Sequence, residues 1–136
     1  PELLMQETGI NSGFMIPQYT AAALVSENKV LCHPSSVDSI PTSLGQEDHV
    51  SMGSISAIKL HQVYANVRNV LAVEMLTASQ ALDFRLPLRP GRGVEKAHQL
   101  IRGLVPHRDA DASFIEDLEA VFAIVDSKDF IDSVSG

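Results

Sequence analysis

The chain has 136 residues, of which 45% are apolar and 20% charged, a composition typical of globular proteins rather than disordered or fibrous ones. Lys and Arg number 10 against 17 Asp and Glu, and the formal charge of −7 argues against general binding to nucleic acid or an anionic membrane. The single cysteine, Cys32, excludes an internal disulfide and a cysteine-rich zinc site.

The first ten residues open on Pro1 and read like the middle of a protein, so we expect a fragment or processed piece of a longer chain. Nothing near this start resembles a secretory signal, and the sequence has no run of about 18 apolar residues that could span a bilayer. A reducing cytoplasm is therefore the expected compartment. We expect Cys32 to be a small buried residue, because no nearby charge would activate its thiol.

Residues 14–31 predict the first long helix, with Pro17 placed in its first turn, where proline is tolerated. Apolar side chains surround this helix on most sides, which indicates burial among other helices. Residues 32–43 then have the composition of a loop, because Pro34 and Pro41 forbid a continuous helix. A loop of this length in a compact domain tends to be functional.

The longest apolar-periodic segment follows, and its entrance at residues 46–52 is rich in polar and ionisable groups. Ser43 and Gln46 have the spacing of a capping box, which predicts a helix start there. Neither proline nor a charge block interrupts the pattern before Phe84, so we expect a helix of roughly 35 residues, on the order of 50 Å long. Residues 63–76 are apolar nearly all round, which predicts a bundle completed by protein outside this sequence.

The remaining segments are shorter. Residues 86–93 read as a linker, in which Arg85, Arg89 and Arg92 are expected to stabilise the C-terminal end of the long helix. A short helix is predicted over residues 94–105, where Pro106 stops it.

A second capping box, Ser113 with Glu116, introduces an amphipathic helix that reaches Val125. The tail after Asp126 is predicted to be a frayed last turn. The sequence therefore predicts an all-α protein, a long-helix bundle in which residues 1–136 form one helical portion of a larger chain.

Residue types of common metal and catalytic sites are present without the required spacing. The five histidines are widely separated and none follows the HExxH pattern, so we expect no metal site: His33, His49, His61, His98 and His107. Asp48, His49 and Ser51 lie too close together at one helix start to aim at one another as a catalytic triad does. Gly91-Arg92-Gly93 lacks the setting of a phosphate loop and is interpreted as a turn.

Glu47 is the one candidate with a chemical argument. At a predicted helix start, backbone N–H groups and the helix dipole would hold its carboxylate in place. Such a carboxylate can simply cap the helix, or it can accept a proton or bind a substrate ammonium or imidazole. The residue pattern alone favours capping and leaves catalysis open.

Four ordered motifs resemble the histidine ammonia-lyase family. They are Gly13-Phe14-Met15-Ile16-Pro17-Gln18, Ala21 to Lys29, His33 to Ser43, and Gln46-Glu47-Asp48-His49-Val50-Ser51-Met52. The likeness continues through Asn66 to Glu74 and Gln80 to Arg85, so it covers most of the chain. It corresponds to the C-terminal quarter or so of the family's polypeptide.

The resemblance implies a mostly helical homotetramer whose long helices form a central bundle and whose active sites combine more than one subunit. Family enzymes act in histidine catabolism and eliminate ammonia from L-histidine to give trans-urocanate. They use an electrophilic methylidene-imidazolone (MIO) formed from an Ala-Ser-Gly triplet. That triplet is absent here and is expected upstream, because Asn11-Ser12-Gly13 precedes the Phe-Met-Ile-Pro motif and is not its match. The chain alone is therefore expected to be inactive without the remainder of the lyase polypeptide.

The resemblance also implies roles for particular residues. Glu47 falls on the family's active-site glutamate, which contacts the substrate and has been considered as a base for the β-proton. Met15 falls on an apolar methionine that lines the pocket, and Gln46 neighbours the same pocket. Asp48 and His49 are interpreted as supporting structure. Gly45 stands where many members have Asn, which affects the backbone before Glu47.

Two alternatives remain at this point. The wider family includes phenylalanine and tyrosine ammonia-lyases and aminomutases, although the Glu47-Asp48-His49 run favours the histidine branch because an acidic residue suits an imidazole better than a phenyl ring. In a different class, the chain is a helical assembly module without catalysis.

Overall fold

The structure, a computed structural model, describes residues 1–37, 39–47, 50 and 52–135. Its helices, in chain order, are the 3-10 helix η1 (Glu2–Leu4), α1 (Met15–Leu31), the 3-10 helix η2 (Ser43–Gly45), α2 (Gly53–Asp83), α3 (Arg92–Arg102), α4 (Ile115–Val125) and α5 (Lys128–Ser135). No β-strand is present among the described residues, so the all-α prediction is confirmed.

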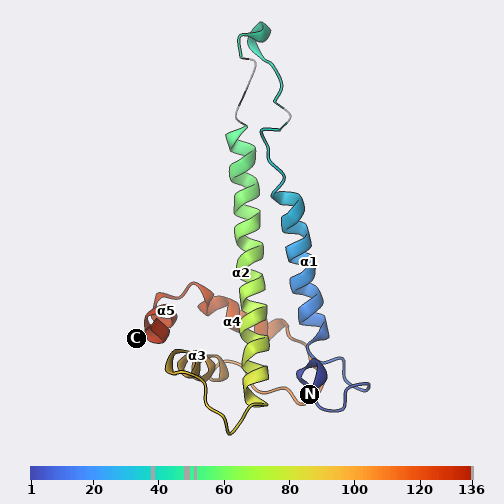
Figure 1. The fold of residues 1–136 in the computed structure, drawn as a ribbon, viewed down its shortest axis with the longest axis vertical. Coiled ribbons are helices and arrows are strands. Elements are labelled where there is room, and N and C mark those ends of the chain that lie inside the picture. Colours follow the sequence, from blue (N-terminus) through green and yellow to red (C-terminus); the bar gives the residue numbers. More distant parts are fainter. Residues whose placement is uncertain (38, 48–49, 51, 136) are drawn as a thin grey trace.

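α1 and α2 pack side by side as an antiparallel hairpin that gives the molecule its length (Figure 1). The described residues between them, 32–37, 39–47, 50 and 52, lie beyond the helix ends at the top of Figure 1, and we call them the arm. α3, α4 and α5 gather beside the C-terminal half of α2, at the end of the hairpin where the N-terminus also lies (Figure 1). The arm is therefore remote from the end of the hairpin that the shorter helices cover.

The core lies around the C-terminal half of α2, where that helix meets the shorter helices and the segment before α1. Its buried apolar side chains come from the segment before α1, from α2, from the end of α3 with the residues after it, and from α4: Met5, Phe14, Ala72, Leu76, Ile101, Val105 and Val121. The rings of Phe14 and Phe114 pack with their centroids 4.8 Å apart. Such a pair adds to the free energy gained from burying apolar area, and it anchors the start of α1 to α4.

The predicted long helix exists, but it begins later than the capping-box pattern predicts. α2 begins at Gly53 and ends at Asp83, so its 31 residues agree with the prediction at the C-terminal end only. Ser43, Leu44 and Gly45 have φ angles of +53°, +58° and +84°, and this left-handed backbone cannot continue into an α-helix. No side chain caps η2, so the predicted capping box of Ser43 and Gln46 is wrong.

The tail after Asp126 is also more regular than predicted. It forms α5, which packs against α3. The Phe130 N–H donates to the Ser127 hydroxyl at 3.4 Å, as at a capped helix start, and the Phe130 side chain packs against the core. The sequence interpretation missed this contact because three apolar residues in a short polar tail, Phe130, Ile131 and Val134, give too few repeats for a clear periodic signal.

The other predicted helices are confirmed with small shifts of their ends. At the second predicted capping box, the Ile115 N–H donates to the Ser113 hydroxyl at 3.4 Å. α4 nevertheless begins at Ile115 with no side-chain cap, so the box is not formed as predicted.

Arg89, in the linker after α2, pairs with Glu95 of α3 at 2.9 Å, and α2 has no basic residue in its last turn. The prediction that the linker arginines serve the end of α2 is therefore wrong for Arg89.

The hairpin helices are much less buried than the sequence predicts when this chain is considered by itself. Large apolar side chains are exposed along both helices: Ile16, Tyr19, Val25, Val30, Ile55, Ile58, Leu60, Tyr64, Val67 and Leu71. Cys32 is exposed as well, against the prediction of burial. None of the helices in the described part of the chain has the length and apolarity needed to span a bilayer.

Candidate functional site

The arm returns on itself through antiparallel pairing. The Val50 N–H donates to the Ser39 hydroxyl oxygen at 2.6 Å, and the same hydroxyl donates to the Val50 carbonyl at 3.3 Å. Further out, the Thr42 N–H donates to the Glu47 carbonyl at 2.8 Å, and the Glu47 N–H donates to the Thr42 carbonyl at 3.3 Å. The two pairs share one register, because Thr42 follows Ser39 by three residues and Glu47 precedes Val50 by three residues. The arm thus has a defined backbone geometry.

The side chain of Glu47 is tied to the same partner. The Thr42 hydroxyl donates to Glu47 Oε2 at 3.0 Å, and both residues are exposed in this chain. Because α2 begins only at Gly53, Glu47 does not lie at a helix N-terminus, and the prediction that helix N–H groups and the dipole hold it is wrong. Threonine on the opposite side of the arm holds the carboxylate instead.

The other two predicted site residues lie in different places. Gln46 follows η2 on the arm, is exposed, and donates its N–H to the Ser43 carbonyl at 3.2 Å. Met15 is the half-buried first residue of α1, at the opposite end of the hairpin (Figure 1). The 17 residues of α1 alone span about 25 Å at about 1.5 Å per residue. One copy of the chain therefore brings Gln46 and Glu47 together but keeps Met15 away from both.

The remaining candidates of the sequence are the group at residues 48–51 and the possible metal ligands. Asp48, His49 and Ser51 lie outside the described residues. Among the residues that are described, no group of three or more His, Cys, Asp and Glu side chains could hold a metal ion.

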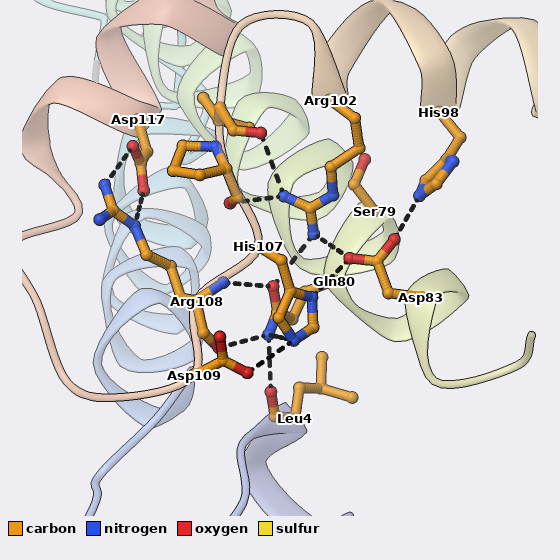
Figure 2. A network of polar contacts seen from close by, with 12 residues as sticks. Leu4, Ser79, Gln80, Asp83, His98, Arg102, His107, Arg108, Asp109 and Asp117 are labelled. Carbon is orange, nitrogen blue, oxygen red and sulfur yellow. Dashed lines mark hydrogen bonds and ion pairs between the residues drawn. The ribbon is translucent and has the colours of Figure 1, made fainter.

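A second polar constellation surrounds Asp83 at the last residue of α2 (Figure 2). Its Oδ1 lies 2.7 Å from His98 Nε2, and its Oδ2 lies 2.6 Å from His107 Nδ1 and 2.7 Å from Arg102 Nη2. The Asp83 side chain is 18% exposed. Burial raises its pKa, but hydrogen bonds from His107 and His98 and the charge of Arg102 together outweigh that effect and hold the pKa of Asp83 below its ordinary value.

Gln80, one turn before Asp83, is fully buried and uses its whole amide. Its Nε2 donates to the Leu4 carbonyl at 3.1 Å and to the Arg108 carbonyl at 2.8 Å. Its Oε1 accepts from Arg102 Nη2 at 3.0 Å and from the Arg108 N–H at 3.3 Å (Figure 2). A buried amide needs such partners, and here they join the N-terminal segment, α2, α3 and the α3–α4 connection.

An ion pair completes this network. Arg108 donates through Nε and Nη2 to both carboxylate oxygens of Asp117, at 2.8 Å and 2.7 Å, and Asp117 is only 4% exposed. The hydrogen bonds to Asp117 raise the pKa of Arg108, although burial opposes them. The network binds three helices to the segment before α1, and its geometry is that of a structural clamp.

Asp111, on the α3–α4 connection, fixes the start of α1. Its two carboxylate oxygens accept the backbone N–H groups of Ser12 and Gly13, each at 2.8 Å. Its own N–H donates to Asn11 Oδ1 at 3.1 Å. Met15 follows two residues after Gly13, so this contact helps to place it.

Sequence reasoning missed the network because its members are distant in the chain. The detectable local signals are the i, i+3 spacing of Gln80 and Asp83 on α2 and the i, i+4 spacing of His98 and Arg102 on α3, which put each pair on one helix face. An acidic residue at the C-terminal end of a helix is unfavourable in the helix dipole, so Asp83 itself indicated the need for a positive partner.

Comparison with known proteins adds independent findings. A family model described as aromatic amino acid lyase matches residues 1–103. Histidine ammonia-lyase of Anaeromyxobacter sp. (strain K) is 59% identical over 126 residues, which cover 93% of this chain and 25% of that protein. Histidine ammonia-lyase of Myxococcus xanthus (strain DK1622) is 54% identical over 134 residues, covering 98% and 26% respectively.

Solved structures give the same picture. Histidine ammonia-lyase from Trypanosoma cruzi superposes with a TM-score of 0.92 at 46% identity, over 99% of this chain and 27% of that one. Tyrosine aminomutase from Streptomyces globisporus superposes with a TM-score of 0.86 at 35% identity, over 99% and 26%. The chain thus spans about a quarter of the length of the relatives it matches.

Proposed function

This chain belongs to the aromatic amino acid lyase family, and we propose that it is the C-terminal helical portion of a histidine ammonia-lyase. The complete protein would eliminate ammonia from L-histidine non-oxidatively and release trans-urocanate, as a step of histidine catabolism. Residues 1–136 contribute part of the active site and part of the subunit core. The chain by itself is inactive, because a site of this kind needs residues that lie elsewhere in the polypeptide.

The observation that carries this proposal is the presentation of Glu47. Its carboxylate is exposed, lies on an arm beyond the hairpin, and is held by Thr42. A carboxylate that serves only the fold would be expected to contact its own core or cap a helix, as Asp117 and Asp83 contact theirs. Glu47 instead is exposed on the arm and contacts only another arm residue, Thr42, among the contacts described above, which suits a site that other protein completes.

The prosthetic group of the family cannot come from this chain, since its sequence contains no Ala-Ser-Gly triplet. In the proposed enzyme the methylidene-imidazolone forms from such a triplet in another part of the polypeptide and supplies the electrophile. The residues of this chain fit a supporting role, because they lack the triplet and would supply the Glu47 carboxylate to the substrate.

Glu47 has two chemical roles open to it in this site. Its carboxylate can bind the imidazole or ammonium of L-histidine by a charge-assisted hydrogen bond, which orients the substrate. It can also accept the β-proton of the substrate on the carboxylate oxygen that Thr42 leaves free, Oε1. Gln46, its neighbour on the arm, would contact the same substrate.

Assembly follows from the exposed hairpin. Isolated apolar residues on a surface are ordinary, but α1 and α2 expose them along their length, and such surfaces are typical of subunit interfaces. We propose a homotetramer in which the hairpins of several copies pack together, in the cytoplasm that the single cysteine favours. Met15 then lines a pocket with residues of other copies, because Glu47 of its own chain is at the far end of α1.

The test uses the complete protein with Glu47→Gln, which keeps the size and one oxygen acceptor of the side chain while removing its charge. We expect most turnover of L-histidine to be lost, measured as the ultraviolet absorbance of the urocanate formed. Glu119→Gln is the matched control, since Glu119 is exposed on α4, away from the arm. Near-normal turnover by Glu47→Gln would refute the proposed role.

One alternative substrate class has a specific observation behind it, the superposition on tyrosine aminomutase. Identity is 46% to 59% with the histidine ammonia-lyases above and 35% with that aminomutase, so histidine is the favoured substrate. Assays of histidine, tyrosine and phenylalanine with the complete protein separate the two. Failure of histidine with turnover of tyrosine would replace our proposal.

A further inference from the structure

We infer that Thr42 is a positioning residue for the Glu47 carboxylate. The inference rests on the proposed role of Glu47 and adds a residue to it. Thr42 does not touch the reacting atoms in this assignment. It acts by fixing where Glu47 points.

The contact between the two residues has three parts. Two backbone hydrogen bonds of 2.8 Å and 3.3 Å join their peptide groups, and the Thr42 hydroxyl donates to Glu47 Oε2 at 3.0 Å. The backbone bonds set the distance and direction between the two side chains. The hydroxyl therefore lies within hydrogen-bond distance of the carboxylate. The second pair on the arm, Ser39 with Val50, holds the same register three residues nearer the helices.

This tie matters because a glutamate side chain has several rotatable bonds and is free to adopt many rotamers when exposed. A hydrogen bond from the neutral Thr42 hydroxyl restricts the rotamers of Glu47 without neutralising its negative charge. A lysine or arginine partner would compete with a cationic substrate group for the same carboxylate. The bond occupies Oε2 and leaves Oε1 for the substrate. Second-layer hydrogen bonds of this kind commonly keep a reacting group in its productive geometry.

Threonine offers a close set of variants for the test. Thr42→Val replaces only the hydroxyl by a methyl group and keeps the β-branch, whereas Thr42→Ser keeps the hydroxyl and loses the methyl. Thr8→Val, at an exposed position in the segment before α1, is the matched control for the same chemical change away from the arm.

The experiment is a double-mutant cycle in the complete protein, with kcat/KM for L-histidine measured for wild type, Thr42→Val, Glu47→Gln and the pair. We expect Thr42→Val to lower kcat/KM about tenfold, equivalent to about 1.4 kcal/mol of barrier. In the Glu47→Gln background the same change should lower it less than about twofold, because the charged group that Thr42 positions is gone. Thr42→Ser should retain most activity, and Thr8→Val should be unchanged.

A general defect in folding gives a different pattern, because it lowers activity by the same factor in both backgrounds. That result, or near-normal activity of Thr42→Val, or equal losses in Thr42→Ser and Thr42→Val, would overturn the inference. Repeating the cycle with Thr42→Ala keeps the test independent of how valine packs in the arm. If Glu47→Gln itself is fully active, the proposed function of Glu47 fails and Thr42 fails with it, whereas an impaired Glu47→Gln beside a normal Thr42→Val refutes Thr42 alone.

Discussion

Replacing Asp83 with asparagine tests whether the buried network at the end of α2 stabilises the fold. The Asp83 carboxylate contacts His98, His107 and Arg102 at 2.6 Å to 2.7 Å and is mostly buried. Hydrogen bonds to charged groups contribute about 1.5–3 kcal/mol each to stability. Asparagine keeps one acceptor oxygen but turns an amide NH₂ group toward donors at the other position, so we expect a loss of about 2–4 kcal/mol.

The assay is urea unfolding of the complete protein at fixed subunit concentration, because association changes the apparent stability. Asp109→Asn is the control, since Asp109 makes the same type of contact with His107 at 3.6 Å while its side chain is 87% exposed. That change should have little effect, as exposed ion pairs contribute little. Equal stability of the Asp83→Asn and Asp109→Asn proteins would refute the reasoning and show that burial of the Asp83 charge cancels its favourable contacts.

The same comparison has a predicted pH dependence. The folded pKa of Asp83 lies below its ordinary value, and an unperturbed aspartate has a pKa of about 3.9. Its contribution to stability is therefore fully present above that unfolded value and is lost as the pH falls through the folded pKa. The titration of Asp83 should therefore leave the stability difference between wild type and Asp83→Asn constant above the unfolded pKa and make it shrink at lower pH. A stability difference that grows on acidification would contradict the lowered folded pKa.

Two further predictions concern the backbone at the ends of α1 and the arm. Gly13→Ala should lower the thermal unfolding midpoint by the equivalent of about 2 kcal/mol or more, since Gly13 has φ +55° and a Cβ there would lie 2.5 Å from the Leu3 carbonyl oxygen. Gly45→Asn should leave the midpoint unchanged, because no atom lies within 4 Å of a Cβ at position 45 and asparagine tolerates φ +84°. Equal effects of the two substitutions would be evidence against a clash between a Cβ at position 13 and the Leu3 carbonyl oxygen. Asp111→Ala should cost about 2–3 kcal/mol by the same measurement, because it removes the acceptor for the N–H groups of Ser12 and Gly13, and Asp111→Asn, which keeps one acceptor, should cost less.

Periodicity was enough to predict the helices, but it could not predict where α2 begins. Apolar spacing reports which residues share a face, and it places α1 and the C-terminal end of α2 correctly. The start of α2 depends on the left-handed backbone of residues 43–45 and on the pairing of Thr42 with Glu47, and both depend on contacts across the arm. A capping-box pattern is a local signal, and here the pairing across the arm outweighs it.

The candidate site shows the same division between local and distant information. The family motifs identify Glu47 as a site residue. Its partner Thr42 lies five residues away, on the opposite side of a turn where the sequence pattern predicts a helix start. The network around Asp83 joins residues 15 to 24 positions apart in sequence through three separate contacts. Residues so far apart have no common period, and their proximity is decided only when α3 packs against α2.

The geometry of the hairpin also constrains the assembly we propose. A single amino-acid substrate is small compared with the length of about 25 Å that α1 spans between Met15 and the arm. If Met15 and Glu47 both line pockets for such a substrate, the two residues of one chain must serve different pockets. An antiparallel arrangement of hairpins from two copies would bring the arm of one to the α1 start of the other. The opposite placement of these two residues is therefore a physical reason why a site built from them needs more than one subunit.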